Sequence, residues 1–198
     1  MTDLPPPVPP VPPTNAQADE DVDHREIATT FIDGRSVPAR PAVSPDGERV
    51  AFVVATISVD ENTTSTRLWL DDAPVTAGPR DADPAWSPDG RFLAFTSRRG
   101  DDEKETTLHV MPVAGPGEVR TVCSMPDGIG DVVWSPDGRT LAFTSRTRHD
   151  RYTAKDPSWQ APRKVQRLFS RLNGLGWVFD RPAHVYVVAA DGTGTPRN

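Results

Sequence analysis

A serine nucleophile is the first chemistry to look for in this sequence. Hydrolases of the α/β type hold that serine in a Gly-x-Ser-x-Gly turn between a strand and a helix. The nearest segment, Gly34-Arg-Ser36-Val-Pro38, carries proline where the second glycine belongs. Proline cannot continue into the helix at that position. We therefore read Ser36 as a loop serine, predict no catalytic residue, and expect no enzymatic activity from this chain of 198 residues.

Metal-ligating side chains do not form a recognisable set either. Four histidines are present, none paired at helical ligand spacing: His24, His109, His149 and His184. Three aspartates each stand alone in a tight turn, where a bond to the local backbone accounts for them: Asp46, Asp89 and Asp137. A further acidic run reads as a solvated loop: Asp101, Asp102, Glu103 and Glu105. We predict no metal site, no cofactor-binding residue and no cofactor.

The composition is that of a globular, acidic chain. Hydrophobic residues make up 36% and charged residues 25%, with a net charge of −6 and a pI near 5.2. An acidic balance argues against generic nucleic-acid binding. No apolar run is long enough to cross a membrane, and the N-terminus lacks the basic and then apolar pattern of a signal peptide. The single cysteine, Cys123, excludes an internal disulfide and reads as a small buried residue. The cytoplasm is the predicted compartment.

The N-terminus has a different composition from the rest. Seven prolines lie within Met1–Pro13, and an acidic, polar stretch follows to Asp23. Such a segment cannot bury enough apolar surface to offset the entropy of ordering it. We predict a disordered tail over residues 1–26 with polyproline II character. A ligand for an aromatic-lined groove is the functional alternative for its PPPVPP run.

The strongest pattern is an internal repeat. Three segments share Ser-Pro-Asp-Gly followed by Ala-Phe: Pro41–Thr56, Pro84–Arg99 and Val132–Thr147. Their opening serines are 43 and 48 residues apart. That period matches the blades of β-propellers, which take about 40–50 residues each. The repeat therefore predicts consecutive propeller blades.

Each repeat predicts a tight hairpin turn followed by a strand with two apolar faces. Proline presets the first central turn position, and glycine then adopts the left-handed conformation without steric cost. In the strand Arg91–Ser97, Phe92 and Ala94 point to one face while Leu93 and Phe95 point to the other. A sheet of this kind must be covered on both sides, as a blade between two neighbouring blades is.

We predict an all-β fold: a partial β-propeller of about three four-stranded antiparallel blades. Further strands are expected at Thr66–Leu70, Thr107–Val113, Val119–Met125 and Ala183–Ala189, with Phe31–Val37 as a candidate entry strand. The incomplete propeller domain is assigned to residues 27–198. Its blades are placed at about 39–80, 81–126 and 127–198, the last with a basic insertion at 148–182.

The repeat carries a family resemblance. The pattern Trp-Ser-Pro-Asp-Gly-Arg, then Leu-Ala-Phe-Thr-Ser-Arg, resembles the repeat of TolB-like propellers and of the propellers of prolyl oligopeptidase-type serine peptidases. The segment Arg163–Gly192 is similar to the third-blade region of bacterial acylaminoacyl-peptidase and dipeptidyl-peptidase homologues. The resemblance extends from about Ala39 to Gly192.

The resemblance implies a non-catalytic propeller that gates or selects peptide substrates for an α/β-hydrolase domain missing from this chain. Three blades cannot close a ring of about 4–8 blades, so we expect a fragment truncated before that domain. Its uncovered blade faces are expected to self-associate. The alternative is a TolB-like propeller that serves as a protein-interaction module without enzymatic role.

The insertion is strongly basic. From Arg146 to Arg171 it holds eight Lys or Arg against two Asp. Nucleic acid is not the favoured partner, because no known binding module accompanies these charges. Docking against the hydrolase domain or against acidic neighbouring blades is preferred. By the family resemblance this region lies near the chamber that substrates cross, which makes Arg167, Arg171 and Asp180 the candidate substrate-binding residues.

Overall fold

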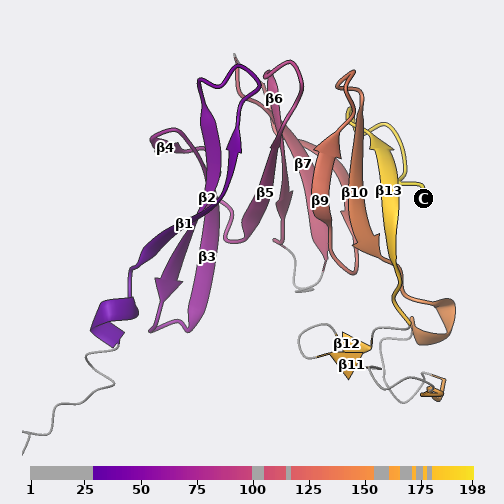
Figure 1. Cartoon of the computed structure of the whole chain (residues 1–198). Helices are drawn as coiled ribbons and strands as arrows, with labels where there is room; N and C mark the ends of the chain where they lie inside the picture. The colour runs from indigo at the N-terminus through magenta and orange to yellow at the C-terminus, as the bar shows by residue number, and fades with distance from the viewer. Residues whose placement is uncertain are drawn as a thin grey trace, which may run out of the picture.

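A computed structural model of the chain shows regular elements that are nearly all β-strands (Figure 1). It describes residues 29–99, 105–114, 117–153, 161–165, 171–172, 176–177 and 180–198. The predicted proline-rich tail, residues 1–26, lies outside the described residues, as do Asp101, Asp102 and Glu103.

Two sheets have four antiparallel strands each. The first has the order β1-β2-β3-β4, with β1 at Ser36–Val43, β2 at Val50–Ser58, β3 at Thr63–Leu70 and β4 at Ala73–Pro74. The second has the order β5-β6-β7-β8, with β5 at Asp81–Trp86, β6 at Phe92–Ser97, β7 at Thr106–Pro112 and β8 at Arg120–Met125. Short connections along the chain produce this simple up-and-down order.

The third sheet is built from β9, β10 and β13, with β10 in the middle. These strands are Gly130–Trp134, Thr140–Arg146 and Ala183–Ala189. The place of an outer strand is taken, in the described residues, by a single bridge in which Val187 and Arg197 exchange two backbone bonds of 2.8 and 3.1 Å. Between β10 and β13 lie the 3₁₀ turn η1, at Asp150–Tyr152, and the paired segments β11 (Arg171–Leu172) and β12 (Gly176–Trp177).

The three sheets stand side by side, with their first strands β1, β5 and β9 as neighbours (Figure 1). The Ser-Pro-Asp-Gly hairpin occurs in each of the three sheets, between its first and second strands. The predicted fold class, a partial β-propeller of antiparallel sheets, is confirmed. We call the sheets blades 1, 2 and 3 in chain order.

The repeated hairpin turns have the predicted geometry. In blade 2 the Gly90 amide donates to the Ser87 carbonyl at 2.9 Å, and Gly90 has φ 68°. The Ser87 hydroxyl donates to Asp89 Oδ1 at 2.6 Å and accepts from the Phe92 amide at 2.9 Å. The Ser87 bond, and then the Arg91 amide, hold the pKa of Asp89 below its usual value. The same bonds recur in the turns that open at Ser44 and Ser135.

Both faces of blade 2 are buried, as the alternation of its strand predicts. Leu93 is fully buried against Ala51 and Leu70 of blade 1. Its neighbour Ala94 is equally buried but packs with Leu108 in the cluster that joins blades 2 and 3. Complete burial of a leucine side chain is worth about 1.5–3 kcal/mol. The contacts between sheets are therefore a main source of the fold's stability.

A tryptophan bond links each blade to the one before it. Trp86 Nε1 donates to the Ala42 carbonyl at 2.9 Å, and Trp134 Nε1 donates to the Ala85 carbonyl at 2.9 Å. Both tryptophans directly precede the Ser-Pro-Asp-Gly turn, and both acceptors lie two residues before that turn in the previous blade. In blade 1 the equivalent position is Val43, which is 60% exposed.

The first strands of the blades share a repeated β-bulge, which provides a second link between blades 1 and 2. Arg40, Asp83 and Asp131 occupy equivalent positions and all have φ near 50°. The Arg40 guanidinium forms an ion pair with the Asp83 carboxylate, which also accepts from the Thr96 hydroxyl at 3.1 Å. A bulge breaks the ladder and turns a side chain in a new direction. Here it lets charged groups on β1 and β5 meet across the gap between blades.

The prediction of an entry strand at Phe31–Val37 is wrong for the first half of that range. Residues 29–32 form a helical turn, closed by a bond of 2.8 Å from the Asp33 amide to the Thr29 carbonyl. Gly34 then takes φ 70°, which ends the turn. The strand β1 begins only at Ser36.

Loss of the indole bond between blades should destabilise the protein. Trp134→Phe keeps an aromatic ring but leaves the half-buried Ala85 carbonyl without its indole donor. We expect a loss of about 0.5–1.5 kcal/mol in the free energy of unfolding in urea. Trp69→Phe is the matched control, because Trp69 stacks on Phe52 within blade 1. An equal loss in both variants would show that the bond between blades is not responsible.

Candidate functional site

Backbone pairing beyond blade 3 brings together the two ends of the insertion. The ladder of β10 and β13 continues past both strands: the Thr147 amide donates to the Pro182 carbonyl at 3.1 Å, and the His149 amide donates to the Asp180 carbonyl at 2.8 Å. Asp180 is thereby fixed beside η1. The 3₁₀ turn itself is capped by His149, whose Nδ1 accepts from the Arg151 amide at 3.2 Å.

Asp180 forms a buried ion pair with Arg163. Its side chain is 4% exposed and that of Arg163 is 20% exposed. Arg163 donates from Nε at 3.0 Å and from Nη2 at 2.7 Å, and both bonds end on Asp180 Oδ2. Charge-assisted bonds of this length are among the stronger polar contacts in proteins.

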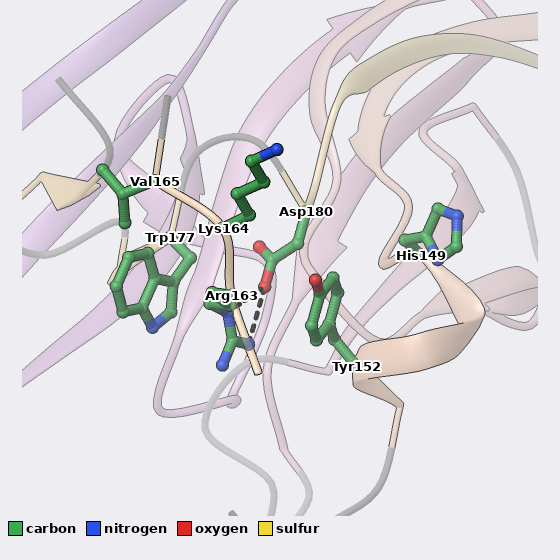
Figure 2. A pocket seen from close by; sticks show the side chains of 7 residues that line it. All are labelled: His149, Tyr152, Arg163, Lys164, Val165, Trp177 and Asp180. Carbon is green, nitrogen blue, oxygen red and sulfur yellow. Dashed lines mark hydrogen bonds and ion pairs between the residues drawn. The ribbon is translucent and has the colours of Figure 1, made fainter. Parts of the chain in front are cut away.

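Two aromatic rings flank the guanidinium of Arg163. Its central carbon lies 4.4 Å from the ring centroid of Tyr152 and 5.0 Å from that of Trp177. Figure 2 shows both rings beside Arg163, with Asp180 on the third side. A cation over the face of an aromatic ring is attracted by the ring quadrupole, most strongly for tryptophan. Arg171 also approaches Trp177, at 5.9 Å from its centroid.

The pair belongs to a larger network that anchors the insertion to its own blades. Arg181 Nε lies 3.6 Å from Asp180 Oδ1, and Arg181 Nη1 donates to Asp127 Oδ1 at 3.3 Å. Arg148 donates to the same Asp127 oxygen at 2.8 Å. Asp127 lies in the turn between β8 and β9, where blade 2 passes into blade 3. Buried charges are tolerated only when paired in this way.

Three buried polar atoms of this network have no hydrogen-bond partner within the described part of the chain: Arg148 Nε, Asp180 Oδ1 and Arg181 Nε. Native structures contain few such atoms, and each calls for an explanation such as strain or an absent ligand. Their concentration in one place makes this region, among the described residues, a candidate site for a polar group.

A small pocket with a volume of about 120 Å³, partly open to solvent, lies beside the pair (Figure 2). Its described lining residues are His149, Tyr152, Arg163, Lys164, Val165, Trp177 and Asp180. Its volume is below the range of about 300–1,000 Å³ that is typical of sites for whole small molecules. The lining offers aromatic surface, cations and one carboxylate, a set suited to binding charged groups.

The structure places two of the three predicted substrate-binding residues in this region. Asp180 lies in the pocket and Arg171 lies at its margin beside Trp177, whereas Arg167 lies outside the described residues. Sequence reasoning missed Arg163, Tyr152 and Trp177 as members of the site. The density of basic residues around Arg163 was a signal, but it did not identify the arginine that pairs with Asp180.

Other residues considered for chemistry have structural surroundings. His109 stacks on Phe95 at 5.1 Å between ring centroids, and burial, then the charge of Arg99, lower its pKa. His184 packs edge-on against Tyr186. The prediction that Ser36 is a loop serine is wrong, because Ser36 begins β1 and pairs with Thr56. Among the described residues no three His, Cys, Asp or Glu side chains form a possible metal site, and no helix has the length and apolar character that crossing a bilayer requires.

Comparison with known proteins places this geometry in context. No model of a known protein family matches the chain. Over 96 residues, or 45% of the chain, it is 35% identical to the uncharacterized peptidase YuxL of Bacillus subtilis, of which it covers 14%.

Solved structures show the fold of a larger part of the chain. The uncomplexed acylaminoacyl peptidase of Pyrococcus horikoshii matches 84% of this chain with a TM-score of 0.62 at 17% identity, and 25% of that protein is covered. Its orthorhombic crystal form matches 83% of the chain with a TM-score of 0.61 at 16% identity, covering 24% of that protein. The predicted resemblance to the propeller part of a peptidase is confirmed over a fragment, since the chain spans a quarter or less of these proteins.

The cysteine of the chain should be chemically inert in the folded state. Cys123 is buried, and burial raises the pKa of its thiol to about 11. The reactive thiolate is then scarce at pH 8. We expect iodoacetamide to modify Cys123 at pH 8 at least about tenfold more slowly in the native protein than in urea. Equal rates, measured by mass spectrometry, would contradict its burial between blades.

Proposed function

We propose that the chain is the non-catalytic β-propeller portion of a prolyl oligopeptidase-like serine peptidase. Its role is to gate or select peptide substrates for a separate α/β-hydrolase domain. The observation that carries this proposal is the 35% identity to a curated peptidase. The blade arrangement, similar to that of an acylaminoacyl peptidase with a TM-score of 0.62, supports it.

The chemistry of the candidate site agrees with selection by binding. The pocket is lined by Asp180, Arg163 and Lys164 and by the rings of Tyr152 and Trp177. Peptides carry charged termini and side chains that such groups recognise through charge-assisted bonds. We propose Asp180 and Arg171 as peptide-binding residues, with Arg167 kept as a candidate on the same segment of chain.

A TolB-like interaction module is the second candidate, and the peptidase relative does not favour it. The two functions differ in what they bind. A substrate-selecting propeller binds short blocked peptides, whereas an interaction module needs the surface of a folded partner. The predicted cytoplasmic location is common to both and remains a prediction.

The proposal is tested by activity and binding together. The pure 198-residue chain is expected to hydrolyse no acylaminoacyl or peptide substrate and to give no fluorophosphonate adduct, because it holds no nucleophile elbow. It is expected to bind N-acetylated peptides in isothermal titration calorimetry, and more weakly after Lys164→Ala. Stoichiometric labelling of any serine would overturn the non-catalytic assignment. Absence of peptide binding would overturn the selecting role.

Self-association is expected through the outer faces of blades 1 and 3. Val43, Val133 and Val185 are each about 60% exposed on these faces, and apolar patches of this kind mark contact surfaces. Light scattering after size exclusion should show a mass that rises with concentration. Val185→Lys should reduce it, whereas Val119→Lys, at a 52% exposed valine beside β8, should not. A monomer at all concentrations would contradict the expectation.

A further inference from the structure

We propose that the pocket around Asp180 is a guanidinium site, that the chain's own Arg163 fills it in this structure, and that an arginine side chain of a peptide can replace Arg163. The identity of that peptide as a substrate rests on the proposed function. The guanidinium site itself rests only on the contacts described below.

The surroundings of Arg163 are those of a site selective for a flat cation. Tyr152 and Trp177 lie 4.4 and 5.0 Å from its central carbon, and Asp180 supplies the negative charge. Arginine stacks on aromatic faces and pairs with carboxylates through its planar fork, which lysine cannot do. Guanidinium and ammonium carry the same charge, so the pocket distinguishes them by shape.

Asp180 can pair with a guanidinium through both carboxylate oxygens, but its pair with Arg163 uses only one of them. Two donor nitrogens of Arg163, Nε and Nη2, end on Oδ2, at 3.0 and 2.7 Å. The buried Oδ1 has no hydrogen-bond partner in the described part of the chain, and Arg181 Nε lies 3.6 Å from it, beyond hydrogen-bonding distance. A guanidinium that is not tethered at position 163 can use both oxygens in two parallel bonds, the stronger arrangement.

Replacement requires Arg163 to leave, because it covers one oxygen of Asp180 and the other is buried. Two features allow this exchange. Arg163 lies in residues 161–165, which belong to no helix or strand, and its two neighbours Lys164 and Val165 are exposed. An incoming arginine side chain takes the place that Arg163 vacates between Tyr152 and Trp177, next to an adjoining cavity of about 120 Å³.

Exchange of one guanidinium for another conserves charge. Asp180 is paired with a guanidinium both before and after the exchange, so neither state carries the penalty for an isolated buried carboxylate. Arg163 competes with the external arginine for Asp180, and it lowers the apparent affinity for that ligand according to the fraction of time that it occupies the site. Removal of Arg163 should therefore tighten binding of an external arginine, which is the opposite of what loss of a ligand-binding residue does.

The test uses N-acetyl-arginine amide as the probe and N-acetyl-citrulline amide as its neutral counterpart of the same shape. Calorimetry on the full chain should show an affinity for the arginine probe that rises about tenfold or more in Arg163→Ala. The added change Asp180→Asn should abolish binding. Arg120→Ala is the matched control, because it removes an arginine that stacks on an aromatic ring, Phe92 of blade 2, outside the pocket. It should change the affinity less than about twofold.

A second measurement guards against misfolding of the variant. The arginine probe should raise the melting temperature of Arg163→Ala, and the citrulline probe should not, because only a ligand of the folded state stabilises it. Equal binding by the two probes, or no gain in Arg163→Ala, would overturn the guanidinium site. Binding of N-acetyl-aspartate amide that is lost in Arg163→Ala would instead show that Arg163 receives an anion. Neither result bears on the fluorophosphonate test, so the two proposals fail separately.

Discussion

Each sheet of this protein has two apolar faces, and the need to cover both determines the rest of the structure. Leu93 and Ala94 are adjacent in one strand and both fully buried, one against blade 1 and the other towards blade 3. No single sheet in water can satisfy such a strand. The blades must therefore stack, and the bonds from Trp86 and Trp134 to the preceding blade fix how they do so.

The stacking also determines where the candidate site forms. Phe143 and Tyr186 stack at 5.7 Å on the buried side of blade 3, which holds β10 and β13 in register. The same pairing, extended past the strands, brings Asp180 beside η1. A long insertion is tolerated at this point because the cost of closing a loop grows only slowly with its length. The packed blade thus supplies a rigid base for residues that belong to no blade.

The repeat was enough to predict the local structure but not the contacts between distant residues. Turn chemistry in four consecutive residues determined the hairpins, and alternation determined the faces of β6. The pairing of Arg163 with Asp180 had no such signal, because it depends on how residues of the insertion fold back on blade 3. The helical turn at 29–32 was missed for a similar reason: Gly34 and a bond to Ile57, far along the chain, end it.

The basic charge of the insertion acquires a different meaning once its partners are known. Arg148 and Arg181 both point to Asp127, while Arg163 and Arg181 both approach Asp180. Two of the eight cations counted in the segment from Arg146 to Arg171, Arg148 and Arg163, are therefore paired within the chain, on buried carboxylates. This agrees with docking of the insertion against acidic groups of its own blades. Three arginines share two aspartates, so Asp180 keeps a neighbouring cation in Arg181, 3.6 Å away, when Arg163 exchanges with a ligand.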